Sequence, residues 1–410
     1  MRSRQRKVIY ILSFLVMMLL QIITQFGFNL KQFFHYEKGT FHRTLKFGGL
    51  SDNKTWHRDT ATEEFAACLL IKDDNHYLIE WLAYHYHRLP LRRLIVAVDP
   101  TSVTSPTSIL DRYRNLGLIN ITQWKDEDFW PEEDRKNWQL DLQSGIRNAR
   151  RQTDLHVHRQ TIFCQQCMRQ LKTENWTWTA FVDVDEYILP NRNVKEAYRI
   201  PGQDSTATIF QLLETAKTSN ISNMLSSPCI HAKRILFGSK ESEPHQVEHS
   251  APQGFNVSNL LTFRWRWHES YSDTFLGKCI LDLSRVNASV HLDIREINIH
   301  RIVRSLCPKA TMYISYEDSS LLVHHYVGSW EQWSFRSDPR SGLGWTRTRA
   351  VFEKRKVNFG QDDSAREWLK SFVDKEGREV ASLLLEGAGL LNTAYTAAKT
   401  NRKFLKSQFL

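Results

Sequence analysis

The chain has 410 residues, of which 41% are hydrophobic and 24% are charged, and its formal net charge at pH 7 is +10. A chain of this length and composition can bury a large core, which excludes a predominantly disordered protein. Four of the positive charges lie in the first seven residues, so the excess over the rest of the chain is mild. This balance suits an anionic ligand. No basic stripe interleaved with aromatic residues points to a nucleic-acid-binding protein.

The N-terminal segment has the pattern of a membrane anchor. Residues 8–30 contain no charged side chain, and about 20 mostly apolar residues in a helix are enough to cross a bilayer core. The basic residues within 1–7 favour a cytosolic tail, with the rest of the chain in the lumen or outside the cell. A cleaved signal peptide is the alternative, but the apolar stretch is long for one and no small-x-small cleavage site follows it. We therefore predict a single-pass type II signal anchor in a secretory-pathway membrane.

Glycosylation sequons and cysteines agree with a luminal chain. Six Asn-x-Ser/Thr sequons begin at Asn53, Asn120, Asn175, Asn220, Asn256 and Asn287, and they predict a glycoprotein. All six cysteines lie after the anchor and allow three disulfides, in any of 15 pairings that the sequence does not distinguish. Cys164 and Cys167 form a Cys-x-x-Cys pair that is typical of redox or zinc sites. Because no second such pair exists, a structural role is favoured.

Three regions follow the anchor. Residues 31–64 have mixed charge and no periodic apolar pattern, so we predict a stem. The folded catalytic domain is predicted over residues 65–360, and a C-terminal helical extension over 361–410.

The folded domain begins with alternating strand and helix patterns. "FAACLLIKDD" predicts a buried strand, and the spacing of apolar residues over 74–88 predicts an amphipathic helix. "RRLIVAVDP" and "LGLINITQW" predict two more strands. A helix predicted over 153–172 leads into "WTAFVDVDEYILPN", which predicts a strand ending at acidic residues. Strands alternating with helices predict an α/β fold with a mostly parallel sheet.

Charged residues follow several of the predicted strands. Lys72, Asp99 and the pair Asp183 and Asp185 all lie at such positions. In parallel α/β sheets, ligands bind at the carboxyl ends of the strands. These residues are therefore predicted to line one site.

The Asp-x-Asp pair indicates a cation. Asp183 and Asp185 are expected to point the same way from a strand, where two carboxylates repel each other unless a cation lies between them. Oxygen ligands favour Mg²⁺ or Mn²⁺, which keep open positions for phosphate oxygens. The alternative is a solvated acidic turn, which the preceding apolar strand disfavours. Glu186 is expected on the opposite face of that strand.

Several motifs resemble glycosyltransferase family 92, a family of membrane-anchored, Golgi-type enzymes with the GT-A fold. The resemblance covers residues 65–355, and Arg264 and Lys278 fall where the family carries an Arg and a Lys. The chain departs from the family pattern at two places. Lys-Asp-Asp at residues 72–74 replaces the family's Lys-Asn-Glu segment, and "VAVDP" lacks the Asp-Asn turn that is common after the family's second strand. The similar segments are "IKDDNHYLIEWLAYH", "HRQTIFCQQCMRQLKTENWTWTAFVDVDEYILP", "ILFGS" and "VHHYVGSWEQW".

The resemblance implies a GT-A (Rossmann-like) domain that binds a nucleoside diphosphate sugar, here expected to be a UDP-sugar. Asp99 would approach the base or ribose, and Asp183 would face the ribose. Lys278 would neutralise phosphate, although an ordinary surface lysine is the alternative, and Lys72 would complete the donor site.

The resemblance also implies a Mn²⁺ or Mg²⁺ ion that acts as a Lewis acid on the leaving diphosphate. Its expected ligands are Asp183, Asp185 and a late histidine. His325 is the expected residue and His324 its rival, because adjacent strand residues point to opposite faces.

The implied reaction is the inverting transfer of a hexose, with galactose as the closest expectation, to a glycan acceptor. Inversion needs a general base, and the candidates are Glu269 and Asp273. Nearby Trp265 and Trp267 would stack on a sugar or simply pack in the core.

Two other classes of function stay open. A luminal carbohydrate-binding protein on a degenerate transferase fold would keep the tryptophans but need not keep the Asp-x-Asp pair. A metal-dependent phosphohydrolase would need more acidic and histidine ligands than the sequence groups together.

Overall fold

A computed structural model describes residues 64–143, 149–203, 207–219, 226–238, 240–243, 247, 251–268, 276–287, 294–308, 313–335, 347–355 and 360–391. The predicted tail and anchor and nearly all of the predicted stem lie outside these ranges, as do both candidate bases, Glu269 and Asp273. Within these ranges, no helix combines the length and apolar character needed to span a membrane.

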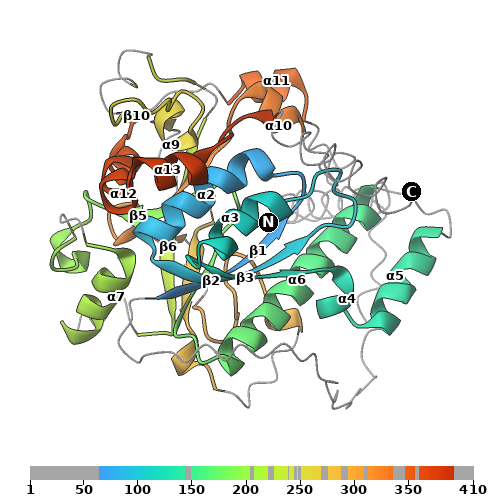
Figure 1. Ribbon diagram of the computed structural model, residues 1–410. Helices are drawn as coiled ribbons and strands as arrows, with labels where there is room; N and C mark the ends of the chain where they lie inside the picture. Colours follow the sequence, from blue (N-terminus) through green and yellow to red (C-terminus); the bar gives the residue numbers. More distant parts are fainter. Residues whose placement is uncertain are drawn as a thin grey trace, which may run out of the picture. The chain divides into compact units, whose positions relative to one another are not determined.

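The fold is a mixed α/β fold built on a ten-stranded sheet (Figure 1). The main path runs β10-β7-β6-β8-β4-β1-β2-β3, and β9 joins β5 to β6. The strands are β1 (Phe65–Ile71), β2 (Leu91–Val98), β3 (Asn120–Trp124), β4 (Trp178–Phe181), β5 (Glu186–Pro190), β6 (Cys229–Phe237), β7 (Trp267–His268), β8 (Lys278–Asp282), β9 (Leu321–Tyr326) and β10 (Gly360–Gln361).

The prediction of a mostly parallel sheet holds for only part of it. β4, β1, β2 and β3 are parallel neighbours, but β8 runs antiparallel to both β4 and β6. Parallel neighbours need a crossover, usually a helix, whereas antiparallel neighbours do not. Helices separate the first four strands, while the described chain between β6 and β8 contains no helix longer than α9 (Leu261–Arg264).

Helices cover both faces of the sheet. On β1, Phe65, Ala67 and Leu69 pack into one core with α2, while Ala66 and Cys68 pack into a second core with α6. This alternation follows from the period of two along a strand. The helices are α2 (Asn75–Arg88), α3 (Thr107–Asn115), α4 (Asp126–Phe129), α5 (Glu132–Gln143), α6 (Ala149–Thr173), α7 (Ile209–Thr218), α10 (Trp330–Phe335), α11 (Arg349–Glu353), α12 (Trp368–Glu376) and α13 (Arg378–Leu385), with short 3-10 turns η2 (Glu196–Tyr198), η3 (Leu283–Arg285), η4 (Ile294–Glu296) and η7 (Ser364–Glu367).

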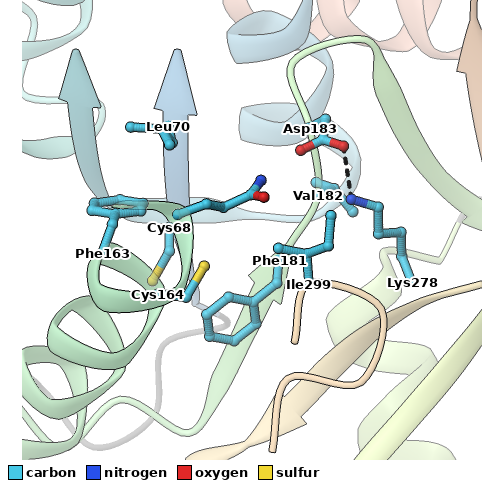
Figure 2. A pocket seen from close by; sticks show the side chains of 10 residues that line it. Cys68, Leu70, Phe163, Cys164, Phe181, Val182, Asp183, Lys278 and Ile299 are labelled. Carbon is cyan, nitrogen blue, oxygen red and sulfur yellow. Dashed lines mark hydrogen bonds and ion pairs between the residues drawn. The ribbon is translucent and has the colours of Figure 1, made fainter. Parts of the chain in front are cut away.

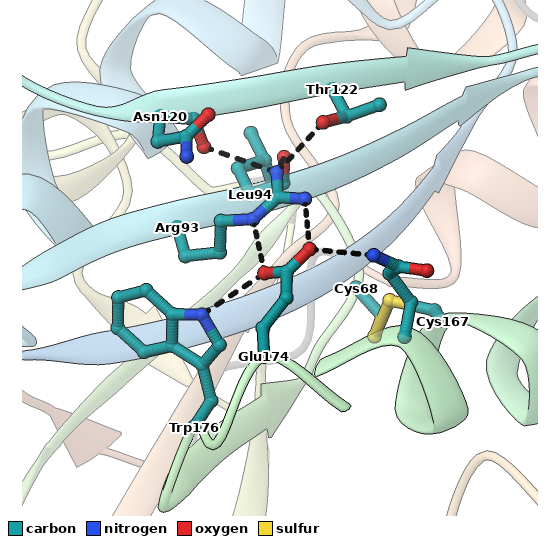
Figure 3. Close-up of polar contacts among 9 residues, drawn as sticks. Cys68, Arg93, Leu94, Asn120, Thr122, Cys167, Glu174 and Trp176 are labelled. Atoms are coloured by element: carbon teal, nitrogen blue, oxygen red, sulfur yellow. Dashed lines mark hydrogen bonds and ion pairs between the residues drawn. A yellow bond between two sulfur atoms is a disulfide. The ribbon is translucent and has the colours of Figure 1, made fainter. Parts of the chain in front are cut away.

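The end of α6 is fixed to the sheet near the amino ends of the strands (Figure 3). Cys167 of α6 forms a disulfide with Cys68 of β1. Just after α6, Glu174 makes a bidentate pair with Arg93 of β2, with N–O distances of 2.7 and 2.8 Å. Arg93 also donates to the Thr122 hydroxyl of β3 at 2.9 Å. These contacts hold the C-terminal end of α6 across three strands.

The structure forms two disulfides and not the three that six cysteines would allow. Besides Cys68–Cys167, Cys229 of β6 is bonded to Cys307. Cys164 and Cys279 are buried free thiols. Cys167 therefore has the structural role that was favoured for the Cys-x-x-Cys pair.

The described part of the predicted C-terminal extension packs on the main core. α12 and α13 lie against α2, and Trp368, Leu369 and Phe372 of α12 are at most 1% exposed in the same core as the α2 residues. These helices are therefore part of the same folded unit as the sheet.

Candidate functional site

The candidate site lies where the strand order diverges. β1 pairs with β2 on one side and with β4 on the other, and ligands of open α/β sheets bind at such a switch point, beyond the carboxyl ends of the strands. A small pocket with about 20 Å³ of enclosed space lies between α6 and this part of the sheet (Figure 2). Its lining is mostly apolar, with polar groups from Asp183, Lys278 and Gln160. The other lining residues are Cys68, Leu70, Phe163, Cys164, Phe181, Val182 and Ile299.

The Asp-x-Asp pair lies in a turn and not on a strand, so the prediction that both carboxylates share one strand face is wrong. β4 ends at Phe181 and β5 begins at Glu186. The Glu186 N–H donates to the Asp183 carbonyl at 3.0 Å, which closes the turn. The two aspartates consequently meet different partners.

Asp183 is paired with a buried lysine. Lys278 Nζ lies 2.8 Å from Asp183 Oδ2 and 3.1 Å from Glu186 Oε2. The Lys278 side chain is 1% exposed and the Glu186 side chain 0%, whereas the Asp183 side chain is 44% exposed. Burial acts to lower the pKa of Lys278, but the two carboxylates outweigh it and raise that pKa above its usual range.

Glu186 organises this cluster, although the sequence pattern assigned it to the other face. Its Oε2 accepts the backbone N–H of Asp183 at 2.9 Å, and its Oε1 lies 3.3 Å from Nη1 of Arg234 on β6. The only sequence signal for this residue is its place directly after the Asp-x-Asp pair, at the start of the next strand.

Asp185 meets His325, while His324 meets another carboxylate. His325 Nε2 lies 3.4 Å from Asp185 Oδ2 and its side chain is 25% exposed. His324 is fully buried, with Nε2 3.4 Å from Asp362 Oδ2 and Nδ1 3.3 Å from the Tyr326 hydroxyl. Burial acts to raise the pKa of Asp362, but His324 and hydrogen bonds from Ser364 outweigh it and lower that pKa. Of the two histidines considered as metal ligands, His325 lies beside Asp185 and His324 does not.

Asp99 lies at the end of β2 as predicted, but its carboxylate is already engaged. Oδ1 accepts the Thr101 N–H at 2.9 Å and the Thr101 hydroxyl at 2.5 Å, and Oδ2 lies 2.8 Å from Arg159 Nη1. Arg159, on α6, also contacts Asp126 at 3.1 Å. Burial opposes ionisation of Asp99, but Arg159, Thr101 and Lys72 together lower its pKa. Asp99 therefore acts here first as a support for Arg159, which the sequence analysis did not single out.

Lys72 is partly buried in the loop after β1. Its N–H donates to Asp74 Oδ2 at 2.9 Å. The next residue, Asp73, has a positive φ of 55° and accepts the Thr104 N–H and hydroxyl at 2.9 and 3.0 Å. These bonds tie the loop after β1 to the loop after β2, so that Lys72 and Asp99 lie at the same edge of the sheet.

The segment that contains the candidate tryptophans and bases, residues 265–273, is described only as far as His268. Trp265 is 2% exposed, so it packs in the core and presents no face to a sugar. Trp267 is partly exposed, and Lys240 Nζ lies 3.9 Å from its ring centroid.

Glu80 of α2 holds the short helix α9, which precedes this segment. It is 1% exposed and accepts the N–H groups of Leu261 and Thr262 at 2.5 and 3.0 Å and the Thr262 hydroxyl at 2.6 Å. Burial raises the pKa of Glu80 to about 7, against the lowering effect of these hydrogen bonds. Glu80 lies within "IKDDNHYLIEWLAYH", one of the segments that resemble the family, but no role was expected for it.

The residues around Asp185 fit a partly protein-ligated divalent cation. Among the described residues, no group of three or more His, Cys, Asp or Glu side chains forms a complete metal site. Asp185 and His325 supply one carboxylate and one imidazole, and both side chains are partly exposed. Mg²⁺ and related ions often take only one or two protein ligands and fill the remaining positions with water and substrate phosphates.

Comparison with protein-family models matches residues 64–347, more than half of the chain, to glycosyltransferase family 92. A search of curated proteins finds no match. The family match includes β1 to β9 and ends before α11, β10, α12 and α13.

Proposed function

The chain belongs to glycosyltransferase family 92. We propose that the enzyme transfers a hexose from a nucleoside diphosphate sugar to a glycan acceptor. The family establishes a glycosyltransferase, which needs a sugar donor and a glycan acceptor. The proposal adds a UDP-sugar donor, a galactose-like hexose, dependence on Mn²⁺ or Mg²⁺, inversion at the anomeric carbon, and a GT-A type of sheet.

The main support for the proposal is that charged side chains lie together at the switch point between β1 and β4. The pocket there has an apolar lining with the exposed carboxylate of Asp183 at its edge. Lys72 and Asp99 border the same edge from β1 and β2, and the donor is proposed to lie across these strand ends.

Asp185 and His325 are proposed to hold the cation. Their oxygen and nitrogen atoms approach to 3.4 Å, and a carboxylate with an imidazole suits Mn²⁺. A bound Mn²⁺ or Mg²⁺ would supply Lewis-acid stabilisation of negative charge on the leaving diphosphate. The backbone fixes the turn against β9, because the Asp185 carbonyl accepts the Tyr326 N–H at 2.9 Å.

The base for an inverting reaction is proposed among Glu269 and Asp273. Both follow β7, whose Trp267 carbonyl accepts the N–H of Gly238 at 3.1 Å. This bond places the entry to the segment beside the end of β6, and β6 is also a neighbour of β9.

The enzyme is proposed to be a single-pass type II protein of a Golgi or other secretory-pathway membrane, anchored by residues 8–30. The sequons at Asn175, Asn256 and Asn287 are exposed in the structure, which a glycan requires. Glycosidase treatment of the full-length protein is expected to lower its mass. An unchanged mass together with a protease-accessible domain in the cytosol would contradict this topology.

A donor screen tests the proposed function. The purified protein is incubated with UDP- and GDP-sugars and a glycan mixture, with Mn²⁺ or with a chelator, and the released nucleoside diphosphate is measured. Release from a UDP-hexose that needs both Mn²⁺ and an acceptor is the expected result. Glycan binding without release from any donor would favour the carbohydrate-binding alternative.

A further inference from the structure

We propose that four residues beyond the family match position the backbone that leads into the candidate bases, and that they thereby set the binding of the glycan acceptor and not that of the donor. They are Gly360, Gln361, Arg366 and Trp368. This inference rests on the proposed function and adds to it a part of the chain that the family match does not include. The four act as positioning residues, through the backbone that they hold.

The backbone in question is residues 261–268, which comprise α9 and β7 and end directly before the candidate bases. Phe237 of β6 pairs with His268 on one side and with Tyr326 of β9 on the other. His268 therefore lies at the same level of the sheet as Tyr326, the residue after the candidate metal ligand His325. β10 and β7 form one end of the strand order, whereas β1 and β2, which border the proposed donor site, lie toward the other end.

β10 completes the pairing of β7. The two strands pair antiparallel, and just after β10 the Asp362 N–H donates to the Arg266 carbonyl at 2.9 Å. The Arg266 side chain returns to β10, where its Nη2 donates to Gln361 Oε1 at 2.5 Å. Because β7 is only two residues long and has β6 on its other side, these contacts fix its position from the C-terminal side of the chain.

Gly360 lets β10 lie directly on the ring of His268. A Cβ atom at position 360 would lie 2.6 Å from Cε1 and 2.7 Å from Nε2 of His268. His268 is 3% exposed, and in a close-packed interior its ring could not move without displacing its neighbours. The absence of a side chain at Gly360 therefore determines where the last described residue before the candidate bases lies.

Arg366 and Trp368 hold α9, at the other end of the same backbone. Arg366 Nη2 donates to the Phe263 carbonyl and, at 2.9 Å, to Oγ of Ser242. Trp368 Nε1 donates to the Thr262 hydroxyl at 3.1 Å. Arg366 is 5% exposed and Trp368 1%, and a shift of α9 would leave these buried groups without their partners, which is costly.

Ser242 extends this contact to the chain after β6. Its N–H donates to the Arg264 carbonyl at 2.8 Å, so Arg366 binds α9 and the chain after β6 together. Glu80 of α2 holds α9 from within the family match. Residues 261–268 are therefore supported on one side by a part of the chain that the family match includes and on the other by a part that it does not.

Half-saturating concentrations test the inference, because a loss of folded protein lowers turnover without changing them. Release of UDP by the full-length protein is measured with Mn²⁺, the UDP-hexose that the donor screen identifies and a glycan mixture, with each substrate varied in turn. Arg366→Met is expected to raise the half-saturating concentration of the glycan mixture by about fivefold or more, and that of the UDP-hexose by less than about twofold. Gln361→Ala, at an exposed position, is expected to raise the glycan value by about threefold.

Glu367→Gln is the matched control. Glu367 lies in the same turn as Arg366 but faces Arg192, after β5, with an N–O distance of 2.7 Å. This exposed ion pair does not touch residues 261–268, so the variant is expected to leave both half-saturating concentrations within about twofold of the wild type. Arg366→Lys keeps the charge and can reach one of the two acceptor oxygens, so its effect is expected to be smaller than that of Arg366→Met.

Asp362 is not a suitable test position, because its carboxylate lies 3.4 Å from His324. His324 is the neighbour of the candidate metal ligand His325, so a substitution of Asp362 would reach the metal as well as the acceptor.

The inference would be overturned by unchanged glycan values in Arg366→Met and Gln361→Ala, by equal rises for the glycan and the UDP-hexose, or by a rise of the same size in Glu367→Gln. If Arg366→Met does not fold, Gln361→Ala decides. A wild-type protein that releases UDP from no UDP-hexose would overturn the proposed function and the inference with it. Wild-type transfer combined with any of the three results above would overturn the inference alone.

Discussion

At the residue scale, two adjacent histidines of β9 have opposite environments. His325 is partly exposed beside Asp185, whereas His324 is buried with Asp362 and its ring lies 4.3 Å from that of Phe237. Neighbouring residues of one strand therefore divide between a candidate metal site and the core, as the alternation of side chains along a strand requires.

These two environments predict different losses of stability and of Mn²⁺ affinity when each histidine is replaced by alanine. His325→Ala is expected to change the free energy of unfolding by less than about 1 kcal/mol, as for partly exposed sites, but to reduce Mn²⁺ affinity by tenfold or more. His324→Ala is expected to cost about 2 kcal/mol or more, since it opens a cavity and removes the imidazole that faces Asp362. Urea unfolding and Mn²⁺ titration of both variants measure this. Equal stability losses would show that the two sites are not distinct.

Glu80 predicts a pH dependence of stability. Burial raises its pKa from 4.5 to about 7, so the folded chain binds this proton more tightly than the unfolded chain. The resulting stabilisation is fully present below pH 4.5 and is lost as the pH rises through about 7. Relative to the uncharged Glu80→Gln variant, the wild type is expected to lose roughly 3 kcal/mol across that window.

Urea unfolding of both proteins at several pH values measures this difference, and the comparison cancels the titration of groups that the two proteins share. A constant difference between the wild type and the Glu80→Gln variant would show that the hydrogen bonds from Leu261 and Thr262 offset the burial of this carboxylate.

At the scale of elements, α6 is both fixed to the sheet and part of the lining of the pocket. Its Cys167 is bonded to β1, its Arg159 reaches Asp99 at the end of β2, and Gln160 and Cys164 line the pocket. A shift of this helix would therefore change the donor side of the site directly.

The disulfide between α6 and β1 gives an element-scale prediction. It joins residues separated by 99 positions, and its removal by Cys68→Ala with Cys167→Ala is expected to cost about 2–4 kcal/mol. Cys164→Ala, a control on the same helix, is expected to cost only about 1 kcal/mol. Alkylation of the unfolded, unreduced protein is expected to label Cys164 and Cys279 only. Labelling at Cys68 or Cys167 would contradict the pairing.

The sequence predicted the helices and strands more accurately than the turn that contains Asp183 and Asp185. The helix expected over 74–88 is found at Asn75–Arg88, and the one expected over 153–172 at Ala149–Thr173, because apolar periodicity reports which face is buried. A turn at Asp183–Glu186 was the disfavoured alternative in the prediction, because both flanking stretches are apolar and resemble one continuous strand. Its geometry depends on the Glu186 side chain returning to the Asp183 N–H.

Contacts between segments that are far apart in the sequence also could not be predicted from sequence patterns. The pairing of Asp183 with Lys278 joins β8 to the turn across 95 positions, and that of His324 with Asp362 joins β9 to residues outside the family match. No local periodicity encodes such pairs. The positions of Lys278 and His325 were expected only through the family resemblance, and the partners of Lys278 were not expected at all.

At the scale of the whole molecule, the folded unit extends past the family match. α12 and α13 follow residue 347, yet Trp368, Leu369 and Phe372 are buried against the same core as α2. Fully burying one such side chain contributes about 1.5–3 kcal/mol. Losing them would expose apolar surface of this core, and a typical domain is stable by only about 5–15 kcal/mol.

Truncations at the two ends of the chain are therefore expected to differ. A chain beginning at Thr62 retains every described element and is expected to fold and keep its activity. A chain ending at Arg355 loses α12 and α13 and is expected to aggregate or to melt without a cooperative transition. Circular dichroism melts and donor turnover of the two truncated proteins measure this, and an active, cooperatively folding protein that ends at Arg355 would contradict it.

The central claim is that the acidic turn after β4 holds the cation on which sugar transfer depends, and the most direct measurement is donor turnover against Mn²⁺ concentration for the wild type and Asp185→Asn. The substitution keeps the shape of the side chain, so the melting temperature is expected to stay close to that of the wild type. Turnover is expected to fall by on the order of a hundredfold or more, because a lost Lewis acid forfeits several kcal/mol of transition-state stabilisation. An Asp185→Asn protein that melts like the wild type and transfers sugar at the wild-type rate would contradict the account.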